Sequence, residues 1–320
     1  MQLFQIPEQK KIRVLIDSDV KNEVDDQFAI VHALLTESFD LRGIVPTHFG
    51  TDKSPHSRKD SEDELNLLLR KMGMEHAVTV ASGAEFIYQQ QKETGILPAG
   101  VQLIINEAMQ AKDRRLYLVF IGPLTDLALA LTEKPEIAGK QVTAIWIGGL
   151  HTKEGGAEPN LKRDMRAAQI VFDSGIDLWQ IPRDVYSMLP VSFAELYVKV
   201  RPYGAIGTYL AENVVAFNNG GPRKPAEYRV LGDSPTIGVL LNENCGRWVI
   251  EQRPEIRDDM SYRRSCRNEA KGRTIRIYES IDTRFILEDF YAKLQLFDAY
   301  CREQGIQNNN LVNEPCNRIG

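Results

Sequence analysis

Five carboxylates lie within ten residues near the start of the chain, in the segment Asp17-Ser-Asp19-Val-Lys-Asn-Glu23-Val-Asp25-Asp26. An apolar run, IRVLI, comes just before them, and a stretch with apolar residues at helical spacing follows. Acidic residues at a helix start are ordinary, because they cap free N–H groups and complement the helix dipole. Five that converge would repel one another unless a cation lay between them. An all-oxygen donor set suits Ca²⁺ or Mg²⁺ rather than Zn²⁺, so the segment predicts a divalent-cation site, with plain helix capping as the alternative.

Short apolar runs alternate with amphipathic stretches over the first 185 residues. We expect strands at residues 12–16, 41–45, 77–81, 116–121, 142–147 and 177–181, with helices at 24–35, 62–72, 101–112, 123–131 and 165–173. This alternation implies right-handed βαβ units and a parallel sheet. The fold class is therefore α/β, a mostly parallel Rossmann-like sheet flanked by helices, with a helical C-terminal part. Without a long Pro/Gly linker, we expect one domain over residues 1–320, with its core at 12–240 and a C-terminal extension at 241–320.

In a parallel sheet the ligand lies beyond the carboxyl ends of the strands. The acidic segment follows a predicted strand, as do Thr47-His48, Gly122-Pro123 and Gly148-Gly149, so all of them should share that rim. A cation would need a further ligand from elsewhere in the chain. Asp233 is the best candidate, because it stands just before another predicted helix at 236–241; a simple N-cap is the alternative.

These residues resemble the signature of the nucleoside hydrolases, the N-ribohydrolases of the inosine/uridine-preferring type. The family's first motif is matched by a strand that ends in Asp17-x-Asp19 and is followed by Asp25-Asp26. Further matching segments occur in the family's order: GPLTDLA at 122–128, IGG at 147–149, AEPN at 157–160, Asp164 with Ala167-Ala168, and GDSP at 232–235. The resemblance covers residues 12–240, and several motifs in one order make it specific.

The resemblance implies Ca²⁺-dependent hydrolysis of the C1′–N bond of a ribonucleoside or related N-riboside, giving ribose and free base. By it, the side chains of Asp19, Asp26 and Asp233 would bind Ca²⁺, and Ile121 would add its backbone carbonyl. Asp25 would be the general base that deprotonates the attacking water. A transition state with oxocarbenium character gains from nearby negative charge and a positioned water, which agrees with these roles.

The resemblance also implies a set of substrate-binding residues. Glu158 and Asn160 would hydrogen-bond the ribose, and Asp17 would support the cluster from just behind it. The family's Gly-Asn after the second strand is absent, since residues 47–51 read Thr-His-Phe-Gly-Thr. We expect Asn22 to replace that ribose contact, with a solvated loop as the alternative.

Two further departures from the family's pattern concern the loop and the leaving group. Six positions separate Asp19 from Asp25, where the family's usual D-x-D-P-G-x-D-D has four, so the loop must bulge by two residues. Gly232 stands where many members carry a His that assists departure of the base. The residues that could contact a base instead, each with packing or surface exposure as the alternative, are Tyr228, Arg223, His151 and Tyr88.

Composition excludes several other classes of protein. With 39 Lys+Arg against 44 Asp+Glu, the net charge of −5 argues against a general nucleic-acid binder. Residues 247–276 hold nine basic against five acidic residues, which favours an Arg-rich hairpin or a subunit interface over a nucleic-acid patch. We expect a cytoplasmic protein without a membrane span, with a small-molecule nucleoside or riboside as its partner and with four reduced cysteines. The family resemblance implies a homodimer or homotetramer.

Two other functions compete with a nucleosidase. A non-catalytic riboside-binding protein on the same fold would keep the cation and lose turnover, as the departures at Asn22 and Gly232 could indicate. A haloacid-dehalogenase-type phosphatase would use Asp17 as nucleophile, Asp19 as acid/base and Mg²⁺. That reading leaves Asp25-Asp26 and the GPLT segment without roles.

Overall fold

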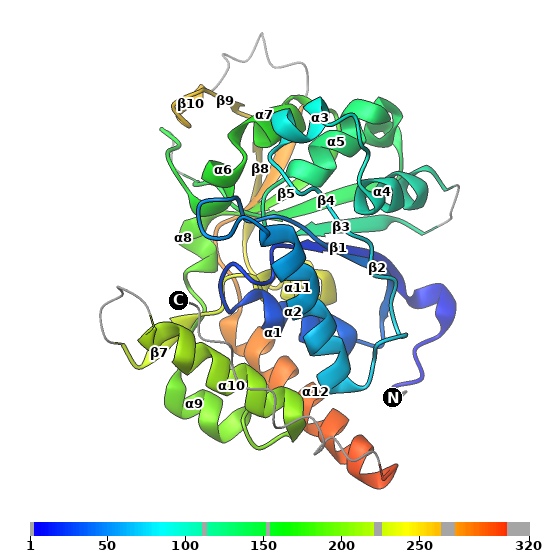
Figure 1. The fold of residues 1–320 in the computed structure, drawn as a ribbon, viewed down its shortest axis with the longest axis vertical. Helices are drawn as coiled ribbons and strands as arrows, with labels where there is room; N and C mark the ends of the chain where they lie inside the picture. The colour runs from blue at the N-terminus through cyan, green and yellow to red at the C-terminus, as the bar shows by residue number, and fades with distance from the viewer. Residues whose placement is uncertain (1–2, 111–113, 152–153, 221–225, 264–272, 306–320) are drawn as a thin grey trace.

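A seven-stranded sheet forms the centre of the computed structural model, which describes residues 3–110, 114–151, 154–220, 226–263 and 273–305 (Figure 1). The strand order is β2-β1-β3-β4-β5-β11-β8, and all neighbours are parallel except β11 and β8. The strands are β1 (Ile12–Ser18), β2 (Phe39–Pro46), β3 (Leu116–Phe120), β4 (Val142–Ile147), β5 (Asp177–Ile181), β8 (Trp248–Gln252) and β11 (Thr274–Tyr278). The α/β class expected from the sequence is confirmed.

Helices cover both faces of this sheet (Figure 1). One face carries α3 (Tyr88–Glu93), α4 (Ala99–Met109), α5 (Thr125–Glu133) and α7 (Met165–Asp173). The other face carries α1 (Asp26–Leu34), α2 (Ser57–Met72), α10 (Gly204–Asn219), α11 (Pro235–Leu241) and α12 (Thr283–Glu303). Successive residues of β1 point to opposite faces, so Val14 and Ile16 enter one apolar core and Leu15 enters the other.

Short elements connect these layers. They are η1 (Glu8–Lys10), η2 (Pro135–Gly139), α6 (Pro159–Arg163), α8 (Arg183–Tyr186), α9 (Phe193–Lys199), and the strand pairs β6 (Pro190–Ser192) with β7 (Tyr228–Val230) and β9 (Glu255–Ile256) with β10 (Tyr262–Arg263). No helix among the described residues is both long and apolar enough to span a membrane.

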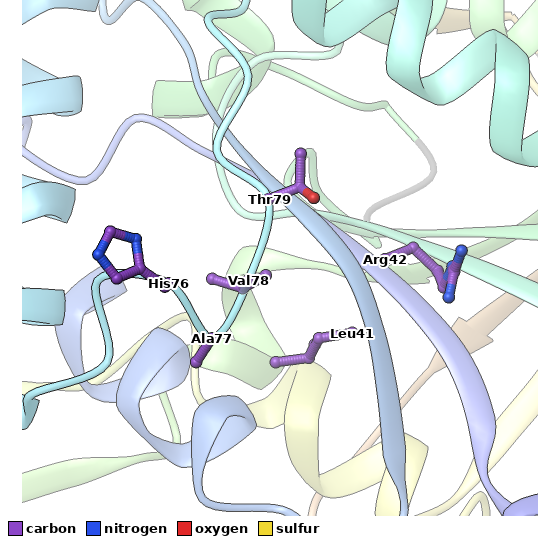
Figure 2. A pocket seen from close by; sticks show the side chains of 6 residues that line it. All are labelled: Leu41, Arg42, His76, Ala77, Val78 and Thr79. Carbon is purple, nitrogen blue, oxygen red and sulfur yellow. The ribbon is translucent and has the colours of Figure 1, made fainter.

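The prediction of a strand at residues 77–81 is wrong. That segment forms only an isolated parallel bridge, between Val80 and Ile44 of β2. The register between β1 and β2 shifts at Val14 and Leu15, whose partners are Leu41 and Gly43, so Arg42 is an extra residue. Such a bulge increases the local twist and interrupts pairing at the sheet edge. A pocket of about 250 Å³ opens there, lined by Leu41, Arg42 and residues 76–79 (Figure 2).

The chain after residue 241 supplies two strands of the central sheet in addition to α12. The hairpin expected for the Arg-rich segment is present as the antiparallel pair of β8 and β11, although residues 264–272 lie outside the described part. In β11, buried Ile275 and Ile277 alternate with half-buried Arg276, the period of a strand with one covered face. The sequence therefore carried a strand signal here that its high charge obscured.

A buried guanidinium fastens this hairpin to the rest of the fold. Arg253, just after β8, is 8% exposed and donates to four backbone carbonyls. These acceptors lie at the end of α7, in the turn that follows it and at the start of β11: Val171, Ser174, Ile176 and Thr274. The Val171 carbonyl also accepts from the Ser174 N–H and hydroxyl, so Arg253 matters most for the carbonyls in the turn after α7, which lie beyond the helix's own hydrogen bonds.

We expect Arg253→Met to lower the free energy of unfolding by about 2–4 kcal/mol, because several buried carbonyls lose their donor at once. Urea denaturation measures this loss, and exposed Arg247, changed to Met, is the matched control, expected to lose less than about 0.5 kcal/mol. Equal losses in the two variants would contradict the structural role of Arg253.

Candidate active site

Three carboxyl groups converge at the carboxyl edge of the sheet. Asp25 directly precedes α1, Asp26 is the first residue of that helix, and Asp233 lies two residues before α11. Their ligand oxygens all lie within 4.8 Å of one another, the group of described residues best placed to hold a metal ion. Asp26 and Asp233 are buried and Asp25 is half-buried. The structure thus brings Asp233 to the acidic segment, where the sequence analysis proposed it as a further ligand from elsewhere in the chain.

Burial and mutual repulsion dominate the electrostatics of this group. The Ser18 hydroxyl donates to Asp26 Oδ1 over 2.6 Å, and the Gly232 N–H donates to Asp25 Oδ2 over 3.0 Å. Burial, and then the neighbouring carboxylates, raise the pKa of Asp26 and Asp233 well above the usual range. A divalent cation would relieve this repulsion, and the all-oxygen donor set fits Ca²⁺ or Mg²⁺.

Asp19 lies beside this group but is held separately. Its Oδ2 accepts a hydrogen bond of 2.9 Å from the Asn22 side-chain amide, and Lys53 in turn donates to Asn22 Oδ1 over 2.5 Å. A Cβ at Gly122 would lie 3.0 Å from the Asp19 carboxylate, so only glycine lets the Ile121–Gly122 peptide approach so closely. Burial raises the pKa of Asp19 to about 7, although nearby Arg163 and Lys53 oppose the rise. Asn22, expected at the ribose, is thus engaged with Asp19 and Lys53.

Asp17 forms a second, deeper carboxyl pair. Asp17 and Asp126 are both fully buried, and no described N–H or hydroxyl group donates to either oxygen of Asp17. Its partner is the Asp126 carboxyl, which itself accepts from the Thr47 hydroxyl and the Ala84 N–H. Burial, and then the nearby Asp126 carboxyl, raise the pKa of Asp17 well above its usual range, because two charges at this depth would repel each other. The proximity of Asp126 to Asp17 was not predicted from the sequence.

Glu158 and Asn160 lie at the next part of the rim. Glu158 caps α6 and is 1% exposed; its Oε2 accepts 2.9 Å hydrogen bonds from the N–H groups of Gly149 and Leu161. Its Oε1 accepts a 2.8 Å hydrogen bond from the Tyr186 hydroxyl. Asn160 is half-buried and donates its side-chain amide to the Ile147 carbonyl over 2.9 Å. Both residues therefore lie beyond β4, where the sequence placed them.

Tyr186 is a residue of the site that the sequence analysis missed. A Cβ at Gly232 would lie 3.1 Å from Tyr186 Cδ2 and 3.1 Å from Asp25 Oδ2, so the tyrosine ring lies next to the position that lacks a side chain. Tyr186 ends α8, which begins two residues after β5. The strand-end rule could have drawn attention to this segment, but a lone tyrosine carried no motif.

The other aromatic and basic candidates are exposed or have contacts outside the acidic group, or lie outside the described residues. Tyr228 is 55% exposed on β7, the Tyr88 hydroxyl meets Thr132 near the end of α5, and His151 lies 3.4 Å from Glu251. Arg223 is outside the described residues.

His48 is a neutral residue of the rim. Its Nδ1 accepts from the Gly50 N–H and its Nε2 therefore donates to the Thr125 hydroxyl. Burial, with the nearby Arg163 guanidinium, lowers the pKa of His48 to about 3. Thr125 passes the chain of hydrogen bonds on to Asp164, which caps α7. His48 thus fits its neighbours and carries no charge near neutral pH.

Fold and site together define a class: a mostly parallel α/β protein with a carboxylate-rich candidate site for a cation at the carboxyl edge of its sheet. The chain belongs to the inosine-uridine preferring nucleoside hydrolase family, whose model matches residues 14–288. It is similar in structure to a purine-preferring ribonucleoside hydrolase from Gardnerella vaginalis, with a TM-score of 0.73 and 20% identity over 90% of this chain and 99% of that one.

Curated relatives match over shorter stretches. The non-specific ribonucleoside hydrolase RihC of Escherichia coli O127:H6 is 28% identical over 197 residues, which cover 54% of this chain and 62% of RihC. Uridine nucleosidase 1 of Arabidopsis thaliana is 25% identical over 212 residues, 58% of this chain and 61% of that protein. The matched stretch thus spans less than two thirds of either relative's length.

We expect the acidic group to make the metal-free protein less stable as pH rises. Folding raises the pKa of these aspartates, to about 6 for Asp25 and about 7 for Asp19, so the folded state binds protons more tightly than the unfolded one. The stability from those protons is complete below about pH 4 and is lost as pH rises through the folded values. In EDTA, Asp233→Asn should therefore raise the melting temperature over the wild type by a margin that grows from about pH 5 to about pH 8.

Scanning calorimetry in EDTA, and then with Ca²⁺ or Mg²⁺, measures this margin. The cation should stabilise the wild type and leave Asp233→Asn unchanged, with the exposed Asp63→Asn as a control that behaves like the wild type. The cation site would be contradicted if neither cation changed the melting temperature of the wild type and if its difference from Asp233→Asn did not depend on pH.

Proposed function

We propose that this protein hydrolyses the N-glycosidic bond of a ribonucleoside or related N-riboside, giving ribose and free base, and that its cation is Ca²⁺. The convergence of Asp25, Asp26 and Asp233 at the sheet rim, in a chain of this family, carries the proposal. The names of two relatives support it, since one is a ribonucleoside hydrolase and the other a uridine nucleosidase.

In this proposal Asp19, Asp26 and Asp233 hold Ca²⁺ through their carboxylates, and Ile121 holds it through its backbone carbonyl. Support comes from the raised pKa values of the three aspartates and from the close approach of the Ile121–Gly122 peptide to Asp19. When bound, the cation would fix the vicinal hydroxyls of the ribose and neutralise the carboxylates around it. Asp19 is not part of the tightest oxygen group, which contains Asp25 instead. For Asp19 to bind the cation, its hydrogen bond from the Asn22 side chain would have to break.

Asp25 is the proposed general base. Burial and the Glu23 carboxylate raise the pKa of Asp25 to about 6, while Arg229 and the Gly232 N–H oppose the rise. A base with a pKa just below neutrality is ionised at pH 7 and still accepts a proton readily. Water attacks C1′ as its proton passes to Asp25. The C1′–O bond forms, the C1′–N bond breaks, and the electrons of the broken bond leave with the nucleobase.

The sugar side of the site consists, in this proposal, of Glu158 and Asn160, with Asn22 at the mouth and Asp17 behind. Burial of Glu158 and its three hydrogen-bond donors fix its carboxylate in one orientation, which suits a group that must recognise a hydroxyl. Asp17 would support the rim from behind, since it is fully buried beside Asp126.

Gly232 brings no proton donor to the leaving group. We propose that turnover is therefore fastest with ribosides whose leaving group departs without protonation. The phosphatase alternative finds no support in the family match. A riboside-binding protein without turnover remains the second candidate, favoured by the glycine at 232.

We also propose a single domain, because β8 and β11 join the sheet that the earlier strands begin. A homodimer or homotetramer in the cytoplasm completes the proposal.

The function is tested by ribose release from inosine, uridine, a methylated nucleoside, a 5′-nucleotide and p-nitrophenyl riboside, with Ca²⁺ and with EDTA. The proposal expects Ca²⁺-dependent release, most rapid from the p-nitrophenyl compound. Binding of these compounds with no release from any of them would establish the riboside-binding alternative and overturn hydrolysis.

Asp25→Asn should lose about 10²–10⁴-fold in kcat, the usual effect of removing a general base. Because Asp25 is not a proposed Ca²⁺ ligand, calorimetry should find Ca²⁺ affinity close to that of the wild type. The exposed Asp173→Asn is the control for both measurements. Loss of Ca²⁺ binding in Asp25→Asn would instead make Asp25 a ligand, as its place in the oxygen group allows.

A further inference from the structure

Tyr186 contacts two parts of the candidate site, the Glu158 carboxylate and the Gly232 peptide. Its hydroxyl donates to Glu158 Oε1 over 2.8 Å. Its ring lies against Gly232, where an added Cβ would be 3.1 Å from Cδ2 and 3.6 Å from Cε2. The Gly232 N–H donates to Asp25 Oδ2 over 3.0 Å. One side chain therefore links the proposed ribose-binding carboxylate to the peptide that holds the proposed base.

The hydrogen bonds of Glu158 leave little freedom for a ligand. A carboxylate offers about two acceptor positions on each oxygen. Both positions on Oε2 are taken by the N–H groups of Gly149 and Leu161, and one on Oε1 is taken by Tyr186. The Asn160 N–H also lies close enough to the carboxylate to lower its pKa. Among the described residues, Tyr186 is the side chain that donates to Oε1, so its hydroxyl sets the direction in which that oxygen can still accept.

The Tyr186 hydroxyl acts as a donor in this arrangement. Burial and the Glu158 carboxylate raise the pKa of Tyr186, so the phenol keeps its proton. Because both Oε2 positions accept backbone N–H groups, Glu158 cannot turn to present another oxygen without losing two hydrogen bonds.

We propose that Tyr186 is a positioning residue that sets the sugar specificity of this site, by setting the direction in which Glu158 Oε1 accepts from one substrate hydroxyl. The same ring packs the Gly232 peptide against Asp25. This inference rests on the proposed function for the identity of the ligand, a furanoside with free hydroxyls. Its consequence is a strong preference at one sugar hydroxyl and not a general affinity for sugars.

The test compares p-nitrophenyl riboside with its 2′-, 3′- and 5′-deoxy analogues, in the wild type and in Tyr186→Phe. Glu158→Gln identifies the hydroxyl that Glu158 binds, as the one whose deletion costs less in that variant than in the wild type. In the wild type, deleting that hydroxyl should cost about 10–100-fold in kcat/KM, the range for a hydrogen bond to a charged group. In Tyr186→Phe this penalty should fall by about 10-fold, while the other two penalties stay within about 2-fold of the wild type.

Tyr88→Phe is the matched control, because it also removes a tyrosine hydroxyl from a buried side chain, here one that meets Thr132. It should leave all three penalties unchanged. Two outcomes overturn the inference. If Tyr186→Phe loses activity equally on all four ribosides, the hydroxyl has only a structural role. If all three penalties in Tyr186→Phe equal those of the wild type, the hydroxyl does not set the specificity.

The same ratios are measured as Kd values by calorimetry, so the inference is tested even without turnover. A wild type that binds ribosides and releases no ribose overturns the proposed hydrolysis, and the shift of one Kd ratio in Tyr186→Phe still decides the role of Tyr186.

Gly232→Ala gives an independent second variant. Its Cβ crowds both Tyr186 and Asp25, so kcat should fall by about 10-fold or more. An unchanged kcat would overturn the packing part of the inference.

Discussion

Repulsion between buried carboxylates is the constraint on which the rest of this site depends. Asp17, Asp19, Asp26, Asp126 and Asp233 are each at most 4% exposed, and each has a raised pKa. Burial disfavours the charged form of every one of them, and their proximity adds to the effect. The two sets of carboxyls differ in how this repulsion can be relieved. The deep pair, Asp17 with Asp126, lies away from solvent and has pKa values that favour the neutral form, whereas the outer group at Asp25, Asp26 and Asp233 has the spacing and donor chemistry for a cation.

The scaffold must hold these groups together against their repulsion, and helix α1 does most of this. It begins with Asp26, and its residues Asp26–Ala33 are all buried. At its other end, His32 hydrogen-bonds Asp289 of α12 over 2.7 Å, and Lys293 joins Asp289 to Thr36. A helix fixed at both ends cannot rotate its first turn away from Asp233. Well-packed surroundings thus keep the mutually repelling carboxyls close together.

The sequence predicted the parts of the molecule that are written in local patterns. Apolar runs located five strands of the sheet, and the acidic segment together with Asp233 located the cluster of carboxyl groups. The strand at residues 77–81 was predicted wrongly because the pairing of an edge segment depends on its neighbour in the sheet. That neighbour, β2, has a bulge at Arg42, which the segment's own residues do not reveal. β11 was missed because the charges around it hid its alternation. Tyr186 and Asp126 could not be predicted as site residues, since their roles arise from contacts with residues 28 and 109 positions away. Such contacts leave no periodicity in the sequence.

The position of β11 between β5 and β8 has a consequence for the order in which the sheet can assemble. β8 precedes β11 in the chain, yet it pairs with the sheet only through β11. During synthesis β8 therefore emerges without a partner, and β5 remains an open edge until residues 274–278 have been made. An unpaired edge of a parallel sheet is a template for association with other chains. The hairpin of β8 and β11 therefore ends the exposure of β5 only when the last strand is complete, and β8 then becomes the edge of the sheet.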